Sequence, residues 1–398
     1  MRIYCKAEQH DVGGFGSFFL ARSEKQLPEL IKAYRGKVQL IYLDPPFGTG
    51  DSFEGKGSKE DSAKITLFRD DMPEAAYLKW MRSILTGCHA LLSPTGSIYL
   101  HIDWRMNAKL RLLLDEIFGA DNFMDEIIWG YKSGGRATRF FPRKHDTILF
   151  YRKSRRVYFN IAAVGTPRGP EPRNHMKQFV DQNGRVGFSI RTRGKLYTYY
   201  EDDLIYPTDV WTDIEHLQQK DKERMGYATQ KPEALLERII LASSQQGDLV
   251  CDLFSGSGTT AAVAVKNDRR FLAVDASPLA LITLRKRLLS ITSCPTLLDE
   301  PETARRTMTL HYPASRCKCE VEYTVEGKSV VITKAMLNRR SELPVYAAIG
   351  HEKERVFHPA RTTATTRLPL KLALPEGVDR PVVQLVNGFG DQVFFTVE

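Results

Sequence analysis

The sequence contains few of the residue patterns by which proteins bind structural metals or form disulfides. Its six cysteines include no Cys-x-x-Cys pair, and Cys317 and Cys319 are separated by a single lysine. The nine histidines show no spacing typical of metal ligands. These absences predict reduced thiols and no metal site.

The sequence also has no apolar run long enough to span a membrane and no charged-then-apolar signal at its start. We therefore expect no membrane partner and a cytoplasmic location. Hydrophobic residues make up 42% and charged residues 26% of the 398, as in ordinary globular proteins, and the length favours more than one domain. The net charge of +9 suits a polyanionic partner, although surface solubility alone would also explain it.

A turn that follows a short apolar run is the first candidate site. Residues 38–42 are apolar and rich in β-branched and aromatic side chains, which predicts a buried parallel strand. Asp44, Pro45, Pro46 and Phe47 follow, and the two prolines stiffen the turn at the carboxyl end of this strand. The Asp44 carboxylate and the Pro45 carbonyl could accept both hydrogens of an exocyclic amine, and Phe47 could stack on a flat heterocycle. A plain strand-ending turn explains the same four residues equally well.

Hydrophobic periodicity predicts an alternation of helices and strands around this turn. The predicted strands are residues 38–42, 96–101, 126–131, 147–151, 248–254 and 270–275, and the predicted helices are residues 29–34, 75–92, 107–118, 233–241 and 261–265. Residues 51–62 are rich in Gly, Ser, Lys and Glu without periodicity, which predicts a mobile loop that could act as a lid.

A basic segment with interleaved aromatic residues follows the strand at 126–131. A run of like charges is usually a solvated face, but a segment of this kind beside the candidate site favours contact with nucleic-acid phosphates and bases. Residues 162–225 are polar and predict an irregular insert whose loops recognise the target. The candidate DNA-binding residues are Lys132, Gly134, Gly135, Arg136, Arg139, Arg143 and Lys144.

A second candidate site lies further along the chain. The predicted strand at 248–254 leads into a glycine-rich turn, and Asp275 ends the next strand about twenty residues on, where an acid can bind ribose hydroxyls. Ala261 stands where a dinucleotide fingerprint would have its third glycine. The pattern therefore predicts that the ligand of this site is a nucleoside with a short polar tail rather than a pyrophosphate. A tight turn without a ligand is the alternative, but it leaves Asp275 unused.

Three motifs in a fixed order resemble one enzyme family. Asp44-Pro45-Pro46-Phe47 comes first, Thr229-Gln230-Lys231-Pro232 follows the basic insert, and Phe254-Ser255-Gly256-Ser257-Gly258 comes last. This order is similar to that of the β group of amino-group DNA methyltransferases, including modification methyltransferases of restriction systems. The resemblance covers roughly residues 38–289. It implies an α/β fold, a Rossmann-like S-adenosylmethionine-dependent methyltransferase sheet with permuted motif order.

The resemblance also implies roles for individual residues. Asp44, Pro45, Pro46 and Phe47 would be catalytic, with Phe47 stacked on a base flipped out of double-stranded DNA. Transfer would be direct and in line, and there is no Pro-Cys dipeptide of the kind that C5 methyltransferases use. The implied cofactor-binding residues are Thr229, Gln230, Lys231, Pro232, Asp252, Phe254, Ser255, Gly256, Ser257, Gly258, Thr259, Thr260 and Asp275.

Four segments follow from this assignment. Residues 1–130 would form the catalytic half of the methyltransferase domain, 131–225 the target-recognition insert, 226–293 the cofactor-binding half and 294–398 a β-rich C-terminal domain. Two hairpins are predicted in the last segment, whose function is not legible. Residues 20–24 lack the Gly-Asp-Asn-like turn common in the family, and Ala228 replaces a frequent proline.

Asp44 at the first motif position favours adenine N6 in the family, so site-specific adenine-N6 methylation is the first hypothesis. Cytosine-N4 methylation, RNA adenine methylation and a catalytically silent DNA-binding subunit are the alternatives. The sequence leaves open whether the chain forms a homodimer and whether a restriction endonuclease accompanies it.

Overall fold

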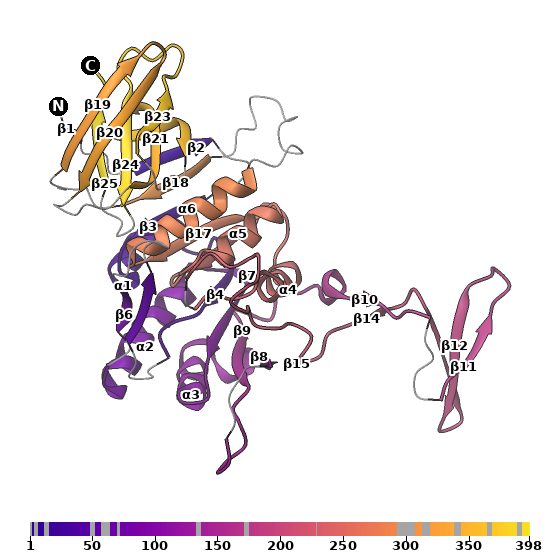
Figure 1. Cartoon of the computed structure of the whole chain (residues 1–398). Helices are drawn as coiled ribbons and strands as arrows, with labels where there is room; N and C mark the ends of the chain where they lie inside the picture. The colour runs from indigo at the N-terminus through magenta and orange to yellow at the C-terminus, as the bar shows by residue number, and fades with distance from the viewer. Residues whose placement is uncertain are drawn as a thin grey trace.

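The computed structural model describes residues 2–3, 7–11, 16–47, 52–56, 64–69, 72–132, 137–170, 175–227, 229–292, 307–312, 319–337, 344–363, 368–387 and 392–398. A central, mostly parallel sheet organises the molecule (Figure 1). Eight of its fifteen described strands lie in the order β3 (Gly16–Leu20), β17 (Arg270–Asp275), β16 (Leu249–Asp252), β4 (Val38–Leu43), β7 (Leu92–Ile102), β9 (His145–Arg152), β8 (Phe123–Gly130) and β15 (Val210–Trp211). Beyond β3 the same sheet continues through β18 (Thr307–His311), which is parallel to β3, into the strands of the C-terminal region.

The first five of these strands run parallel, and β9 is antiparallel to both β7 and β8. All six residues of β4 are buried, which is typical of a strand covered on both faces. Side chains of β4 alternate between the two faces, so Leu40 and Tyr42 enter one core and Ile41 and Leu43 enter the other. The predicted Rossmann-like α/β fold is confirmed.

Helices cover both faces of the sheet. The first face holds α1 (Ser23–Tyr34), α2 (Glu74–Leu91) and α3 (Asn107–Phe118), with the short η1 (Ala120–Asn122) after α3. Leu30, Met81 and Leu110 of these helices lie fully buried in one hydrophobic cluster with Ile41 and Ile98. Buried side chains recur every three to four residues in these helices, and this spacing predicted a helix in each of the three segments.

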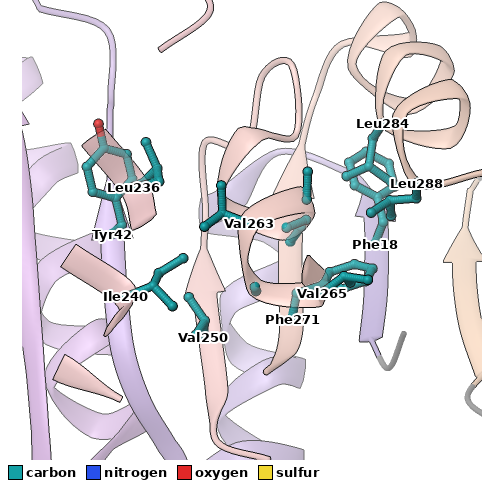
Figure 2. Close-up of a cluster of buried hydrophobic side chains, with 14 of the residues drawn as sticks. Phe18, Tyr42, Leu236, Ile240, Val250, Val263, Val265, Phe271, Leu284 and Leu288 are labelled. Carbon is teal, nitrogen blue, oxygen red and sulfur yellow. The ribbon is translucent and has the colours of Figure 1, made fainter. Parts of the chain in front are cut away.

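The opposite face holds α4 (Glu233–Ser243), α5 (Thr259–Lys266) and α6 (Pro278–Thr292). Figure 2 shows Leu236 near Tyr42, and Leu284 beside Phe18, in the cluster that joins these helices to the sheet. In α5, the residues Thr259 to Val265 are all buried. Its small side chains let this helix lie close against β16 and β17.

The insert between β9 and α4 is more regular than predicted. After η2 (Ile161–Val164), β10 (Thr166–Pro167) pairs with β14 (Leu204–Ile205). Between them, β11 (Lys177–Val180), β12 (Val186–Thr192) and β13 (Lys195–Tyr200) form an antiparallel sheet. Figure 1 shows this sheet projecting far from the central sheet.

The prediction of an irregular insert was therefore wrong. Phe188 is fully buried in this small sheet, whereas most of the neighbouring side chains are exposed on both faces. In β12, Val186, Phe188 and Ile190 alternate with small or polar residues, and this alternation was the signal that could have predicted the strand.

The predicted loop at residues 51–62 was also partly wrong. β5 (Ser52–Lys56) pairs with β6 (Lys64–Arg69) as an antiparallel ribbon, while residues 57–63 lie outside the described part of the chain. The lid role of this segment stays a prediction.

The C-terminal region is built of strands β18 (Thr307–His311), β19 (Cys319–Glu326), β20 (Ser329–Leu337), β21 (Pro344–Lys353), β22 (Val356–Thr363), β23 (Leu370–Ala373), β24 (Val382–Asn387) and β25 (Gln392–Thr396). The two predicted hairpins are confirmed as β19–β20 and β24–β25. At the other end of the chain, β1 (Arg2–Ile3) pairs with β25, and β2 (Ala7–Asp11) pairs with β18 and β22. The first strands of the chain thus belong structurally with its last ones.

Candidate active site

Two turns meet at the same edge of the central sheet. β16 and β4 are parallel neighbours, with Cys251 opposite Ile41, so the turns after them leave the sheet side by side. Both turns border one cavity of about 570 Å³. The two candidate sites of the sequence are therefore parts of a single site.

The catalytic motif forms one wall of this cavity, and Asp44, Pro45, Pro46 and Phe47 all line it. The Tyr77 hydroxyl donates a hydrogen bond of 2.7 Å to the Pro46 carbonyl. This bond ties the backbone of the turn that follows Asp44 to α2.

The glycine-rich turn forms another wall of the cavity. The two carboxylate oxygens of Asp275 accept hydrogen bonds of 2.8 Å from the backbone N–H groups of Gly256 and Ser277. Gly258 has a φ of +74°, and a side chain there would meet Leu284 at 3.1 Å. Only glycine fits this position without strain. Burial raises the pKa of Asp275.

Asp252 also holds this turn, through two hydrogen bonds. Its carboxylate is 4% exposed and accepts hydrogen bonds from the Thr260 hydroxyl at 2.6 Å and from the Phe254 N–H at 2.9 Å. Burial raises the pKa of Asp252 from 3.8 to about 7, although both hydrogen bonds act in the other direction.

This shift predicts a pH-dependent stability that Asp252→Asn removes. The folded protein holds a proton on Asp252 between pH 3.8 and about 7, whereas the unfolded chain has released it. The resulting stabilisation is present at low pH and is lost as the pH rises through about 7. Between roughly pH 5.5 and pH 8, the free energy of unfolding in urea should fall by about 2 kcal/mol more for wild type than for Asp252→Asn. The difference arises below the folded-state pKa of about 7, at about 1.36 kcal/mol per pH unit. Equal pH slopes for the two proteins would contradict this assignment.

Most of the predicted cofactor-binding residues line the cavity. They are Thr229, Lys231, Asp252, Phe254, Ser255, Gly256, Ser257, Thr259, Thr260 and Asp275. Three others lie outside the lining. The Gln230 side chain bonds to the Met225 N–H and the Glu223 carbonyl, while Pro232 and Gly258 directly precede α4 and α5.

Of the candidate DNA-binding residues that the structure describes, Lys132, Arg139 and Arg143 are exposed. The Arg143 guanidinium lies 4.0 Å from the Trp104 ring centroid and 4.8 Å from that of Phe140. Arg139 is exposed and Lys144 is half-buried, while the Lys132 amine lies 3.5 Å from a Glu215 carboxylate oxygen. Gly134, Gly135 and Arg136 lie outside the described residues.

Sequence reasoning missed a buried polar chain beneath the catalytic motif. His101 is completely buried and lies 2.8 Å from the Tyr42 hydroxyl and 3.1 Å from an Asp146 oxygen. The Tyr131 hydroxyl donates to the other Asp146 oxygen at 3.1 Å. Phe47 stacks on the His101 ring, with the centroids 6.0 Å apart. Burial acts to raise the pKa of Asp146, but His101 and then Lys231 lower it below its ordinary value.

Removing His101 should therefore destabilise the protein. In His101→Ala the Tyr42 hydroxyl and the Asp146 carboxylate both lose a buried partner, at a cost of about 3 kcal/mol. Tyr42→Phe removes a single hydroxyl and should cost only about 1 kcal/mol. Urea unfolding at pH 7 measures both values. A loss for His101→Ala no larger than that for Tyr42→Phe would contradict the proposed importance of the chain of hydrogen bonds.

The wall between the two motifs was also not predicted. Trp80 packs edge-on against Phe254, with ring centroids 5.5 Å apart, and its indole N–H donates to Glu24 at 3.4 Å. The Ser23 hydroxyl donates to the Leu253 carbonyl. Residues 22–24 thus line the cavity although they lack the turn that the family usually has there.

The cavity suits a nucleoside with a polar tail. It combines aromatic side chains with the backbone of a glycine turn and an acid at the end of β17. The buried Ser255 hydroxyl makes no hydrogen bond within the described part of the chain, which leaves it available to a ligand. Among the described residues, no group of three or more His, Cys, Asp or Glu side chains is arranged to hold a metal ion. No helix within the described ranges is long and apolar enough to cross a membrane.

Comparison with known proteins agrees with this geometry. The model of the DNA methylase family matches residues 38–282, more than half of the chain, and the chain therefore belongs to this family. It is 30% identical over 297 residues to the type II methyltransferase M.EcaI of Enterobacter cloacae, covering 63% of this chain and 64% of that protein. It is 29% identical over 265 residues to the DNA adenine methyltransferase YhdJ of Escherichia coli K12, covering 63% and 75%.

Among solved structures, the chain is similar to the cytosine-N4-specific PvuII DNA methyltransferase, with a TM-score of 0.46 and 16% identity over 69% of this chain and 88% of that one. The match to M.EcaI spans less than two thirds of that protein's length. The predicted likeness to modification methyltransferases of restriction systems is confirmed.

Proposed function

We propose that the chain methylates adenine N6 in double-stranded DNA at a specific sequence, using S-adenosylmethionine. The position of the Asp44 carboxylate carries the proposal, because it lies on a rigid turn inside the cavity that the cofactor loop also lines. An aspartate at this motif position and the likeness to an adenine methyltransferase both favour adenine over cytosine.

In this mechanism the chain holds the target amine between two acceptors. The Asp44 carboxylate and the Pro45 carbonyl accept its two hydrogens, because the prolines offer no N–H groups that would compete. The nitrogen lone pair is then free to attack, while Phe47 stacks on the flipped base. The cofactor supplies the methyl group, and alignment of the two reactants gives much of the acceleration. An Asp44 oxygen would accept the proton that the amine releases, and S-adenosylhomocysteine would be the other product.

The cofactor would lie across the glycine turn. Asp275 would accept hydrogen bonds from its ribose hydroxyls, and the backbone of Gly256 would border its methionine part. Lys231 and Thr229, on the segment before α4, would bind its carboxylate. The aromatic wall of Trp80 and Phe254 offers a flat surface to its adenine.

The DNA would bind across the exposed basic and aromatic surface beside β8 and β9. Phe141 is 95% exposed and Phe140 57% exposed, next to Arg139 and Arg143. Large aromatic side chains rarely stay this exposed unless they meet a partner, and stacked bases are a suitable one. The Arg143 guanidinium, held between two rings, is positioned in advance for a phosphate.

Arg143→Ala should weaken DNA binding more at low salt than at high salt. Log K falls as log salt concentration rises, and a lost phosphate contact makes this fall less steep by about 1, because fewer counterions are released. Fluorescence anisotropy with a labelled duplex at several salt concentrations measures this slope. Arg82→Ala, which removes an exposed arginine of α2 that pairs with Glu116, is the control. A loss for Arg143→Ala that does not depend on salt would remove Arg143 from the interface.

Expression of the chain in a bacterial host without its own adenine methylation tests the function. Sequencing that detects modified bases should find N6-methyladenine at one recurrent sequence. Methylation only at cytosine N4 would contradict the choice of adenine, and methylation confined to RNA would contradict the choice of substrate. The homodimer and the endonuclease partner stay predictions.

A further inference from the structure

Lys231 occupies the position where the target amine is proposed to bind. Its Nζ donates a hydrogen bond of 2.6 Å to Oδ2 of Asp44. Both side chains are mostly buried, with 15% and 16% exposed, and the ammonium lies 5.4 Å from the centroid of the Phe47 ring. In this structure, therefore, a lysine satisfies the oxygen that an incoming amine would need.

The backbone of Lys231 is fixed to the cofactor loop. Its carbonyl accepts a hydrogen bond of 3.1 Å from the Thr259 hydroxyl, which in turn accepts one of 3.0 Å from Arg287. The anchor point is thus rigid, while the four-carbon side chain can rotate about it. Such a lysine can reach different anions without any movement of the backbone.

Apart from Lys231, the cavity lining offers few cationic side chains that could bind an incoming carboxylate. The described lining contains five acidic side chains, Glu24, Asp44, Asp146, Asp252 and Asp275, but only two cationic ones, Arg22 and Lys231. Arg22 pairs with Glu24 at 2.6 Å, and its side chain is 67% exposed. A ligand that brings a carboxylate into this acidic cavity is therefore best stabilised by Lys231.

We propose that Lys231 is a positioning residue that exchanges between Asp44 and the cofactor carboxylate, so that the target base is captured only after the cofactor binds. This inference rests on the proposed function. A neutral amine cannot easily displace an ammonium from a carboxylate, because the exchange loses the Coulomb attraction between the two opposite charges. The cofactor carboxylate can compete for the ammonium on equal terms, which releases Asp44 for the base.

Base capture can be measured without any methyl transfer. A duplex with 2-aminopurine beside the target adenine, which keeps its own N6 amine, becomes more fluorescent when that adenine leaves the stack. Wild-type protein should bind the base at least about tenfold more tightly with S-adenosylhomocysteine than without a ligand, a difference of about 1.4 kcal/mol. 5′-Methylthioadenosine, which has no carboxylate, should fill the nucleoside site without producing this gain.

Variants of Lys231 separate exchange from a merely structural role. Lys231→Met should capture the base equally well with and without S-adenosylhomocysteine, whereas Lys231→Arg should retain the dependence. Lys32→Met removes an exposed lysine that pairs with Glu29 and should behave as wild type. Thermal unfolding of each variant checks that it is folded.

Two results would overturn the inference while leaving the proposed function intact. They are equal capture by wild type with and without S-adenosylhomocysteine, and undiminished dependence on the ligand in Lys231→Met. If wild type captures the base neither with nor without a ligand, the proposed function itself fails, and the inference fails with it.

Discussion

Asp44→Ala is expected to lower the rate of methyl transfer by about 100- to 1000-fold, the effect typical of removing one precisely placed polar group from a reacting centre. The carboxylate is one of the two acceptors proposed to hold the amine, and it also receives the released proton. Alanine offers neither function. Steady-state incorporation of labelled methyl groups into plasmid DNA measures the loss.

Cofactor binding supplies the control for Asp44→Ala. Because Asp44 pairs with Lys231, its removal leaves that lysine free for the cofactor, so affinity for S-adenosylhomocysteine should not fall. Glu29→Ala, at an exposed position of α1, should methylate as wild type does. Unchanged methylation by Asp44→Ala would refute the catalytic assignment.

Asp275→Ala should weaken cofactor binding by about 100-fold, or roughly 3 kcal/mol. The substitution removes the acceptor of two backbone N–H groups, at Gly256 and Ser277, and so releases the turn that borders the cavity. It also removes the proposed partner of the ribose. Isothermal titration with S-adenosylhomocysteine measures the affinity.

Asp248→Ala is a matched control at the other end of the same region. Asp248 also accepts a backbone hydrogen bond, at 2.7 Å from the Gln245 N–H, but it lies before β16 and far from the cavity lining. This variant should lose some stability and keep its cofactor affinity. Equal losses of affinity in both variants would show that Asp275 acts through the fold alone.

The sequence predicted the elements whose pattern is local. β4 is a continuous apolar run ended by prolines, and α3 has regular helical spacing from residue 107 to residue 118, so both were recognised almost to their ends. The two turns of the site could also be placed, because parallel strands bring their carboxyl ends to one edge.

Contacts between distant segments could not be read in the same way. The chain from Tyr42 through His101 to Asp146 joins three strands, and no single one of these residues stands out in its own strand. The adjacency of β7 and β9 was the signal that could have linked His101 to Asp146. The pairing of β1 with β25 joins the two ends of the described chain and has no local pattern.

Lys231 shows how a motif can be found while its contacts are missed. The resemblance assigned this lysine to cofactor binding, whereas the structure pairs it with Asp44, which is 187 residues earlier in the chain. An ion pair of this kind depends on the side-chain geometry inside the cavity. The sequence brings the two residues to the same site but does not reveal that they touch.

The most direct test of the central claim uses the purified protein, unmethylated plasmid DNA and S-adenosylmethionine with a deuterated methyl group, followed by mass spectrometry of the nucleosides. We predict N6-methyladenine that carries the heavy methyl group, formed by wild type and lost in Asp44→Ala. The absence of heavy methyl groups from the DNA, while S-adenosylmethionine is bound, would contradict the claim that this site methylates DNA.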